Sequence, residues 1–499
     1  MPDSMSERGD ARAMDRQRLI VVSNRQPYEH RWESDQLVCA RTDGGLTAAL
    51  DPVLRRHGGT WVAWGSGSAD QNVVGPDMCV EVPPESPAYR LHRVWLTPDE
   101  IKGGYLGYAN QVLWPLCHIT LDRIHYLKAF WPAYRSEMHR FANAVLEELD
   151  REPRLVWIHD FHLALLPALI KAERPTAPVS VFWHIPWPSP DVWRILPERR
   201  EMLLGLLASD VIVFQTSSHA EAFFNCTHTF LGAIIPSSRD RVLYNGHETR
   251  VSVRPISVDY RVISEHAVSS SVEQAESVLR QQLGFRAGVR LGLGVDRLDY
   301  TKGLLKRLWA LDEFFTQFPR YRGKFTFLQI AIPTRTEIGT YQLYGDLIRE
   351  TVNDINQRHS ACIKDIPNEG NDWIPILLQE GRIGFDDLVA LYRMADFALV
   401  SSVNDGMNLV AKEYVAAQVC ETGVLLVSQM AGASEELPGA SVINPYEIEG
   451  LAETIKGALE MPLDERRRRM RRMRSYLAAH DIHAWVDGCL QDALVGAQT

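Results

Sequence analysis

The chain has 499 residues, 45% of them hydrophobic and 23% charged, and a formal net charge of −10. This composition is ordinary for a globular protein, and the length exceeds what one hydrophobic core supports, so we expect two domains. The acidic balance disfavours nucleic acid or an anionic membrane surface as the main partner, and an anionic small-molecule substrate would need a local basic pocket. Because no run approaches about 18 apolar residues, we expect no membrane span.

The seven cysteines are scattered and odd in number, and no two of them have CxxC spacing. This pattern favours reduced thiols in the cytoplasm over a disulfide framework or a zinc site. Residues 1–17 are polar and charged and lack the apolar stretch of a signal peptide, so we interpret them as a disordered tail. The oligomeric state stays open, with a homo-oligomer as one alternative.

The first half of the chain repeats one pattern, a short buried strand that ends in polar residues. The pattern occurs at Leu19–Arg25 and again at 155–158, 179–183, 211–214 and 251–253. Helical patterns at 134–149 and 199–208 fall between these strands. The alternation predicts a mostly parallel, doubly wound Rossmann-like sheet over residues 18–260. In such sheets ligands bind at the carboxyl ends of the strands, where the polar residues lie.

The second half begins with residues 260–288, which are polar and helix-prone and which we interpret as the linker region. Strands are then predicted at 291–295, 325–330, 374–378, 397–400 and 424–428, with helices between them. They predict a second Rossmann-like domain over residues 261–480. A terminal helix follows within residues 481–499, and its return to the first domain is one alternative. The predicted fold class is therefore α/β, with two doubly wound domains that face a central cleft.

A run of arginines occurs near the end of the chain, with seven arginines in residues 466–474. We interpret this run as a solvated helix face, partly balanced by Asp464 and Glu465. A nucleic-acid patch is disfavoured because the chain as a whole is acidic.

The most informative stretch is residues 401–418, which follows the predicted strand at 397–400. Asn404-Asp405-Gly406 is a turn signal, and Asn408 is a favoured N-cap for the helix-forming residues after it. The start of such a helix has unpaired backbone N–H groups and a positive dipole end, which suit a phosphate. Carboxylates would repel that phosphate, so we assign Asp405 and Glu413 to hydrogen bonds from sugar hydroxyls. The combination indicates a sugar nucleotide, with an ordinary N-capped helix as the alternative.

A basic cluster, Arg297 and Lys302, lies in the loop after the predicted strand at 291–295. The chain has no GxxxxGK[ST] motif and no GxGxxG after its first strand, which disfavours a P-loop and the usual dinucleotide site. It also has no Asp-x-Asp pair, which disfavours a metal-held diphosphate. We therefore expect these cations and backbone amides to stabilise a departing diphosphate, with no essential metal and no cofactor.

In the first half, His159, Asp160, His162 and His184 follow predicted strands. These residue types suit the recognition of sugar hydroxyls and proton transfer, and a structural hydrogen bond is the alternative for each of them. They do not form a persuasive set of metal ligands. The absence of a GxSxG motif disfavours an α/β-hydrolase.

Taken in order, these motifs resemble the trehalose-6-phosphate synthase family of retaining glycosyltransferases, over about residues 18–490. The segments that carry the resemblance are Ser23-Asn24-Arg25, Gly44-Gly45, Asn110–Pro115, His159–His162, His184–Pro186, Arg297–Gly303 and Asp405–Tyr414. The resemblance implies two Rossmann-like domains of the GT-B type with the active site between them. It also implies small-molecule substrates, a nucleoside-diphosphate glucose and a sugar phosphate, and neither nucleic acid nor a membrane as a partner.

The resemblance further implies roles for the residues at matching positions. On the donor side, the residues that would bind the diphosphate are Arg297, Lys302, Gly45 and the amides of Leu409 and Val410. Glu413 would bind the ribose. The residues that would bind the glucose are Asp405, Gly406, Met407, Asn408 and His184. On the acceptor side, Arg25 and Arg335 would bind the phosphate of glucose 6-phosphate, with Tyr105, Trp114 and Asp160 around its sugar. The expected catalytic set is Arg297, Lys302, His184 and Asp160, with no metal.

The implied activity is transfer of glucose to glucose 6-phosphate with retention of configuration, which gives trehalose 6-phosphate. In the family's front-face mechanism, the leaving diphosphate helps to deprotonate the acceptor hydroxyl while Arg297 and Lys302 stabilise its charge. Two residues depart from the family pattern, Asn404 in place of arginine and Ser257 in place of glycine. One alternative is a sister synthase with another phosphorylated acceptor, such as glycerol 3-phosphate, that makes glucosylglycerol phosphate. Another is a non-catalytic subunit that senses sugar phosphates. The nucleotide stays open among UDP, GDP and ADP.

Overall fold

The computed structural model describes residues 19–42, 44–152, 154–283, 288–361 and 373–496. The chain divides into two compact units, unit 1 with Met1–Pro255 and Trp485–Thr499, and unit 2 with Ile256–Ala484. The expected tail, residues 1–17, lies outside the described residues. No helix in the described part of the chain combines the length and the apolar character that crossing a membrane requires.

Unit 1 is built on a sheet with the strand order β10-β11-β9-β8-β7-β1-β4-β6-β5. Its strands are β1 (Leu19–Arg25), β4 (Gly59–Trp64), β5 (Cys79–Val82), β6 (Tyr89–Val94), β7 (Leu155–His159), β8 (Val179–Trp183), β9 (Val211–Phe214), β10 (Arg241–Tyr244) and β11 (His247–Val253). The inner pairings are parallel, and the edge strands β5 and β10 are antiparallel to their neighbours. Strands β7, β8 and β9 are buried along their whole length, as expected for parallel strands covered on both faces.

The chain order of these strands defines where a ligand would bind to unit 1. From β1 the chain builds outward through β4 and β6, and it then returns to place β7 on the other side of β1. The β1/β7 junction is therefore the topological switch point. In open α/β sheets, ligands bind outside the carboxyl ends of the strands at that point.

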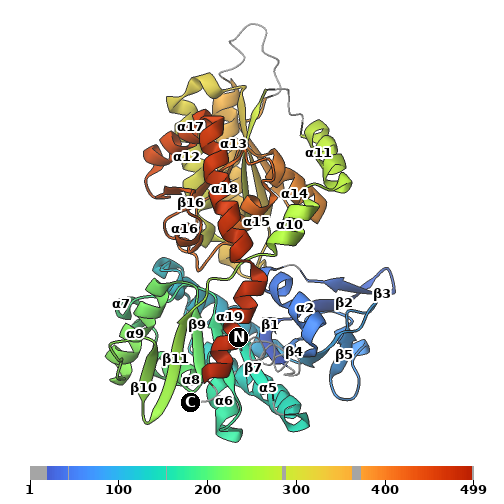
Figure 1. Cartoon of the computed structure of the whole chain (residues 1–499), viewed down its shortest axis with the longest axis vertical. Coiled ribbons are helices and arrows are strands. Elements are labelled where there is room, and N and C mark those ends of the chain that lie inside the picture. Colours follow the sequence, from blue (N-terminus) through green and yellow to red (C-terminus); the bar gives the residue numbers. More distant parts are fainter. Residues whose placement is uncertain (1–18, 43, 153, 284–287, 362–372, 497–499) are drawn as a thin grey trace, which may run out of the picture. The chain divides into compact units, whose positions relative to one another are not determined.

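Helices surround this sheet (Figure 1). They are α2 (Gly45–His57), α3 (Pro98–Glu100), a π-helix (Ile101–Leu113), α4 (Trp114–Cys117), α5 (Phe130–Arg151), α6 (Leu166–Glu173), α7 (Pro190–Trp193), α8 (Arg199–Leu207), α9 (Ser217–Leu231) and, from Trp485 onward, the terminal helix α19 (Ile482–Gly496). A separate hairpin consists of β2 (Tyr28–Glu33) and β3 (Gln36–Arg41). The ring of Trp485 lies 5.4 Å from that of Trp157 on β7, so the last helix packs against the sheet of unit 1.

Unit 2 has a fully parallel sheet with the order β14-β13-β12-β15-β16-β17. Its strands are β12 (Arg290–Arg297), β13 (Phe325–Ile332), β14 (Ile376–Glu380), β15 (Phe397–Val400), β16 (Val424–Ser428) and β17 (Ser441–Ile443). Here the chain builds from β12 to β14 and then returns to place β15 beside β12, so the switch point is β12/β15. Both units are thus doubly wound α/β structures, which confirms the predicted α/β class with two doubly wound domains.

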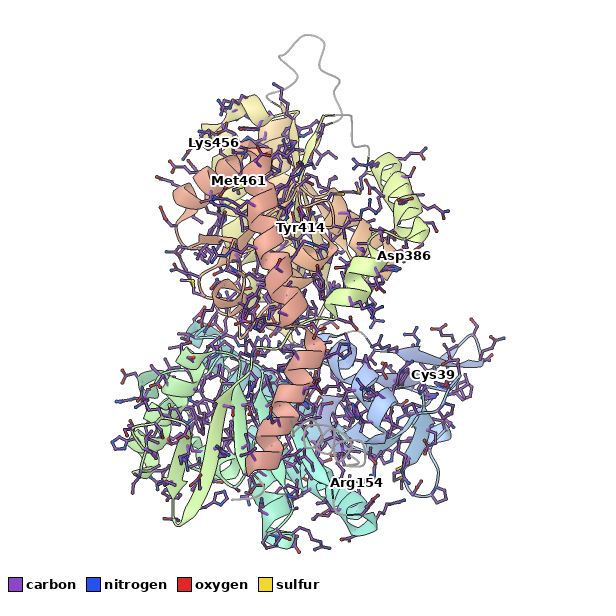
Figure 2. The ribbon with its side chains drawn as sticks, in the orientation of Figure 1. Cys39, Arg154, Asp386, Tyr414, Lys456 and Met461 are labelled. Atoms are coloured by element: carbon purple, nitrogen blue, oxygen red, sulfur yellow. The ribbon has the colours of Figure 1, made fainter. Side chains whose placement is uncertain are left out.

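The helices of unit 2 are α10 (Tyr260–His266), α11 (Ser270–Gln282), α12 (Leu304–Gln317), α13 (Gly339–Ala361), α14 (Phe385–Met394), α15 (Leu409–Ala417), α16 (Ala433–Glu436), α17 (Ile448–Glu460) and α18 (Leu463–Ala479). Tyr414 of α15, labelled in Figure 2, is fully buried and donates a hydrogen bond to the carbonyl of Ala395. Helix α15 is therefore anchored in the interior of the unit.

The interpretation of residues 260–288 as a linker was wrong for the part that the structure describes. Residues 260–266 and 270–282 form α10 and α11, and these helices pack against α15 and α14. The hydroxyl of Ser264 donates to the carbonyl of Ala416 at 2.9 Å. Only a few apolar residues of these helices are buried, such as Ile263 and Leu279, and the pattern therefore resembles that of a solvated segment.

The arginine run is a solvated helix face only in part. Arg466 is 5% exposed, and its guanidinium donates to the carbonyls of Ala458 and Leu459 at the end of α17. Arg474 donates to the carbonyl of Ala416 at the end of α15. Cations at helix C-termini satisfy the last carbonyl groups and offset the negative end of the dipole. These two arginines therefore stabilise the helices that carry or support the predicted donor site.

Candidate functional site

The predicted donor residues of unit 2 meet at the β12/β15 switch point. Lys302 lies between β12 and α12, and its Nζ is 2.6 Å from Oδ2 of Asp405, which lies between β15 and α15. The same carboxylate oxygen accepts hydrogen bonds from Ser402 at 3.1 Å and from Asn408 at 3.2 Å. Two loops that are about a hundred residues apart in sequence are thus joined through one carboxylate.

Gly303 allows these two loops to approach one another. Its φ is +66°, and a Cβ at this position would lie 2.0 Å from the carbonyl oxygen of Ser401. Any side chain would therefore collide with the backbone at the end of β15. A glycine here lets Lys302 reach Asp405.

The N-terminus of α15 lies directly after this carboxylate. The side-chain oxygen of Asn408 accepts a hydrogen bond from the backbone N–H of Ala411 at 3.1 Å and caps the helix. The backbone N–H groups of Leu409 and Val410 are in the first turn, where a helix provides no intrahelical acceptor. The amide of Ala433 donates to the carbonyl of Met407 and holds the preceding loop in place. A positive helix end beside a lysine and a carboxylate suits a phosphorylated sugar.

Arg297, predicted to bind the donor diphosphate, and Arg335, predicted to bind the acceptor phosphate, lie close together in unit 2. Arg335 follows β13, and its Nη1 is 3.2 Å from Oδ2 of Asp299, while Nη2 of Arg297 is 3.9 Å from the same atom. Burial raises the pKa of Asp299, but the charges of Arg335 and Arg297 outweigh burial and hold it below its usual value. Arg335 also donates to the hydroxyl of Tyr341 at 2.6 Å. Asp299 was not assigned a role from the sequence, and it links the predicted donor cation to the predicted acceptor cation.

Glu413 projects from α15 and is half-buried. Its Oε2 accepts a hydrogen bond from the hydroxyl of Tyr392 at 2.8 Å, and burial raises its pKa. A carboxylate held on one oxygen by a phenol keeps its other oxygen for a further donor. Such a group suits a ribose hydroxyl, and no spacing in the sequence pointed to Tyr392.

In unit 1, Asp160 and His184 follow β7 and β8, and Oδ1 of Asp160 accepts a hydrogen bond from the backbone N–H of His184 at 3.1 Å. The Nε2 of His184 lies 3.1 Å from Nδ1 of His159, and its Nδ1 lies 3.3 Å from Nε2 of Gln215. Burial lowers the pKa of His184 to about 3, so the ring is neutral at physiological pH. A neutral imidazole suits hydroxyl recognition and not a cationic role.

The predicted acceptor residues of unit 1 include an aromatic wall. Tyr105 stacks on His162 with 5.7 Å between ring centroids and lies 5.3 Å from Trp64. Trp64 is the register partner of Arg25, whose side chain is at the exposed end of β1. The structure thus brings Arg25 and Tyr105 near one another through Trp64, which sequence reasoning missed.

The remaining unit 1 residues lie at the same edge of the sheet. The ring of Trp114, at the start of α4, is 5.8 Å from that of Phe161, which directly follows Asp160. Gly45 is the first residue of α2. Both positions are at loops or helix starts beyond the carboxyl ends of strands, where a ligand of this fold is expected.

Three of the predicted site residues have an unusual backbone conformation. The φ angle is +77° at Asp160, +48° at Arg335 and +98° at Asn408. Few non-glycine residues adopt positive φ, and such conformations cluster at binding sites because the surrounding structure must impose them. This observation supports these three positions as parts of functional loops.

Two doubly wound Rossmann-like units, one with a cationic helix start at its switch point, have the fold and the site geometry expected for the GT-B type. Residues 17–494 match the family model of glycosyltransferase family 20. The chain therefore belongs to glycosyltransferase family 20, and the resemblance to trehalose-6-phosphate synthases is confirmed.

Known relatives cover nearly the whole chain. It is 33% identical over 484 residues to the trehalose-6-phosphate synthase of Mycobacterium avium, with 95% of each chain covered. It is 32% identical over 483 residues to alpha,alpha-trehalose-phosphate synthase [UDP-forming] A of Dictyostelium discoideum, and it spans 62% of that longer protein. It also resembles the crystal structure of a UDP-forming alpha,alpha-trehalose-phosphate synthase from Burkholderia xenovorans in complex with glucose-6-phosphate. That match has a TM-score of 0.84 and 31% identity, and covers 96% of this chain and 100% of the other.

Proposed function

We propose that this protein is a retaining glucosyltransferase that transfers glucose from UDP-glucose to glucose 6-phosphate and forms trehalose 6-phosphate. The observation that carries the proposal is the contact of Lys302 with Asp405 at the N-terminus of α15, at the switch point of unit 2. Family membership and the UDP-forming relatives support the choice of reaction and of nucleotide. A cytoplasmic location and a small-molecule donor and acceptor belong to the same proposal.

For the donor, we assign the diphosphate to Arg297, Lys302 and the amides of Leu409 and Val410. Lys302 is 12% exposed, so its charge acts in a partly desolvated environment where electrostatic attraction is stronger than in water. Asp405 already accepts hydrogen bonds on Oδ2, and its position fits a glucose hydroxyl as a further donor. The rest of the glucose would contact residues 406–408 and His184, with Gly45 against the diphosphate and Glu413 on the ribose.

For the acceptor, we assign the phosphate to Arg25 and Arg335 and the sugar ring to Tyr105 and Trp114. Planar guanidinium groups bind phosphate oxygens through two parallel hydrogen bonds, and aromatic walls suit a hexose ring better than a short polyol. We assign Asp160 to the acceptor sugar, where its carboxylate would accept a hydrogen bond from a hydroxyl. The stacked pair Tyr105 and His162 supports this assignment because it offers a flat apolar face.

In the reaction, the bond between the anomeric carbon and the diphosphate stretches while the acceptor hydroxyl approaches the same face. The hydroxyl proton passes to the leaving diphosphate oxygen as the new glycosidic bond forms. Arg297, Lys302 and the α15 amides stabilise the charge that grows on the diphosphate, which is electrostatic preorganisation of the kind that lowers barriers most. Holding the two substrates in line supplies a further part of the rate.

The test is nucleotide release by the purified chain across donors and acceptors. We expect UDP release from UDP-glucose with glucose 6-phosphate, and the same rate in the presence of EDTA, because no metal takes part in the proposed step. Nucleotide release with glycerol 3-phosphate but none with glucose 6-phosphate would favour a glucosylglycerol-phosphate synthase. The absence of release with every pair would favour a non-catalytic, sugar-phosphate-sensing subunit. Activity that EDTA abolishes and Mg²⁺ restores would contradict metal independence.

A further inference from the structure

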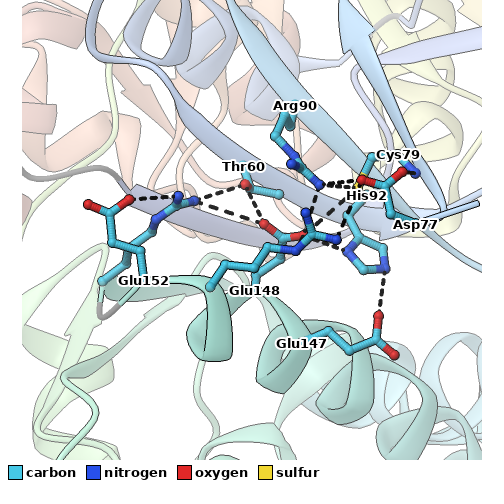
Figure 3. Close-up of polar contacts among 10 residues, drawn as sticks. Thr60, Asp77, Cys79, Arg90, His92, Glu147, Glu148 and Glu152 are labelled. Atoms are coloured by element: carbon cyan, nitrogen blue, oxygen red, sulfur yellow. Dashed lines mark hydrogen bonds and ion pairs between the residues drawn. The ribbon is translucent and has the colours of Figure 1, made fainter. Parts of the chain in front are cut away.

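A second cluster of chemically active side chains lies in unit 1, at the edge strand β5 and its neighbour β6, and away from the carboxyl ends of β1 and β7. It consists of Cys79 on β5, His92 on β6 and Glu148 on α5 (Figure 3). Cys79 and His92 are register partners on antiparallel strands, so their side chains are neighbours on one face of the sheet. Helix α5 packs over β6 and brings Glu148 to the same place.

The donor atoms of the three side chains lie close together. Oε1 of Glu148 lies 3.0 Å from Nδ1 of His92 and 3.8 Å from Sγ of Cys79. The three donor atoms all lie within 4.8 Å of one another, and all three residues are buried. A tetrahedral zinc ion, with bonds of about 2.0 to 2.3 Å to such atoms, needs ligands at this mutual separation.

Two of the three donor groups are also contacted from behind. The second oxygen of Glu148 accepts a hydrogen bond from the hydroxyl of Thr60 at 2.9 Å and lies 3.9 Å from Arg154. The Nε2 of His92, which faces away from the cluster, lies 3.7 Å from Oε2 of Glu147. A carboxylate near the outer nitrogen of a histidine is the usual outer-shell partner of a metal-binding imidazole. In this structure Nδ1 of His92 donates to Oε1 of Glu148, and it would give up that proton to ligate a metal.

Two arginines supply positive charge at the cluster in this structure. Nε of Arg151 lies 3.6 Å from Oε1 of Glu148, and Arg90 contacts both this oxygen and the sulfur. Its Nη2 lies 3.0 Å from Sγ of Cys79 and 3.5 Å from Oε1 of Glu148. The same atom lies 2.9 Å from Oδ2 of Asp77, and the two side chains are 28% and 40% exposed. Arg90 can therefore leave the sulfur and the carboxylate and keep its ion pair with Asp77. Its departure would open the cluster to solvent on the same side.

We propose that Cys79, His92 and Glu148 bind a divalent d-block cation of the zinc class, through Sγ, Nδ1 and Oε1, with water as the fourth ligand. Sulfur and nitrogen donors select zinc-like ions over Mg²⁺ or Ca²⁺, which prefer oxygen. The thiol and the imidazole release their protons to solvent, and a thiolate with a carboxylate matches the charge of the ion. The ion takes the place of Arg90 and ties the β5–β6 edge to α5. This site is separate from the proposed transfer reaction.

Spacing in the sequence could not indicate this site. Fifty-six residues separate His92 from Glu148, and 69 separate Cys79 from Glu148. Its competitor is a buried network of ion pairs, in which Arg90, Arg151 and Arg154 only neutralise Glu148 (Arg154 is also labelled in Figure 2). In that case the cluster would have no affinity for a metal ion.

Titration with Co²⁺ distinguishes a metal site from a network of ion pairs. The titration uses the full chain without an affinity tag, after treatment with a chelator. We expect one equivalent of Co²⁺ to bind with a thiolate-to-cobalt charge-transfer band and tetrahedral d–d bands, both lost on addition of Zn²⁺. The band should disappear in Cys79→Ser and persist in Cys420→Ser, which removes an exposed cysteine outside the cluster. The absence of a band in the wild type, or its survival in Cys79→Ser, would overturn the proposal.

A gain-of-function variant keeps the test valid if Cys79→Ser does not fold. We expect Arg90→Gln to bind Co²⁺ roughly tenfold more tightly, because the metal no longer has to displace a charged hydrogen-bond donor. Unchanged or weaker binding in Arg90→Gln would contradict the idea that Arg90 occupies the cation position. With Zn²⁺ the melting temperature of the wild type should also rise, as for any ligand that binds only the native state.

Discussion

Replacing Lys302 with methionine removes one charge from the proposed diphosphate site and keeps most of the side-chain volume. Its Nζ lies 2.6 Å from Asp405, and the lysine is 12% exposed. Asp405 keeps its hydrogen bonds from Ser402 and Asn408 in the variant. The carboxylate is therefore not left without donors, and we expect the free energy of unfolding to fall by no more than about 2 kcal/mol.

The effect on catalysis should be larger than the effect on folding. A preorganised donor at the position of a developing negative charge is worth about 2.7 to 4 kcal/mol, or about 10² to 10³ in kcat. Lys302 would interact more strongly with the departing diphosphate than with the bound donor, because charge grows there as the glycosidic bond breaks. We therefore expect kcat to fall by about two to three orders of magnitude, and KM for the donor to change by less than about tenfold.

The assay is nucleotide release at saturating acceptor, for the wild type, Lys302→Met and Lys306→Met. Lys306 is a matched control because it lies in the first turn of α12, and its ammonium contacts the rings of Trp309 and Tyr446. We expect the control to retain the kcat of the wild type. A kcat for Lys302→Met within threefold of the wild type, or an equal loss in Lys306→Met, would refute the proposed role of Lys302.

Three further variants test other parts of the site and fold. Glu413→Gln keeps a hydrogen-bond acceptor for Tyr392 but loses the negative charge. We therefore expect KM for the donor to rise about tenfold, and an unchanged KM would contradict ribose binding by Glu413. Gly303→Ala places a Cβ 2.0 Å from a backbone oxygen at φ +66°. Urea denaturation should therefore show that the free energy of unfolding falls by more than about 1 kcal/mol. Wild-type stability in this variant would contradict the close approach of the two loops. Burial raises the pKa of Glu137, which lies in α5, well above 4.5. Protonation of this carboxylate therefore favours the native state. The stabilisation is complete below pH 4.5 and is lost as the pH rises through the pKa of the native state. Glu137→Gln should therefore gain stability relative to the wild type as the pH rises above 4.5. A stability difference that is independent of pH would show that Glu137 does not titrate in this way.

The strands that could be predicted from the sequence are those whose burial can be recognised from their own residues alone. β7, β8, β9 and β15 are short apolar runs buried on both faces, and each was predicted within a residue or two. The π-helix at 101–113 was not predicted, because its glycines disfavour a helix in isolation. Packing outweighs that preference: a Cβ at Gly103 would lie 2.6 Å from Ala133 of α5, and one at Gly107 an equal distance from Phe130. The contact between the two helices exists only in the folded unit.

The same distinction applies to the site. Lys302 and Asp405 could be predicted because each lies in a short segment with its own turn and helix signals. The joint contact of Arg297 and Arg335 with Asp299 could not be predicted. Arg335 is 36 residues from Asp299, and no local sequence signal links these two residues. Tyr392 and Trp64 were missed for a related reason. Each is defined by the side chain it contacts, and those contacts follow from the order of the strands.

The most direct test of the central claim is the structure of the product formed from UDP-glucose and glucose 6-phosphate, measured by NMR of the anomeric protons. The proposed chemistry at the β12/β15 edge predicts one disaccharide phosphate with both anomeric centres in the α configuration, as in trehalose 6-phosphate. A β linkage from the donor glucose, or release of UDP with free glucose and no disaccharide, would contradict it.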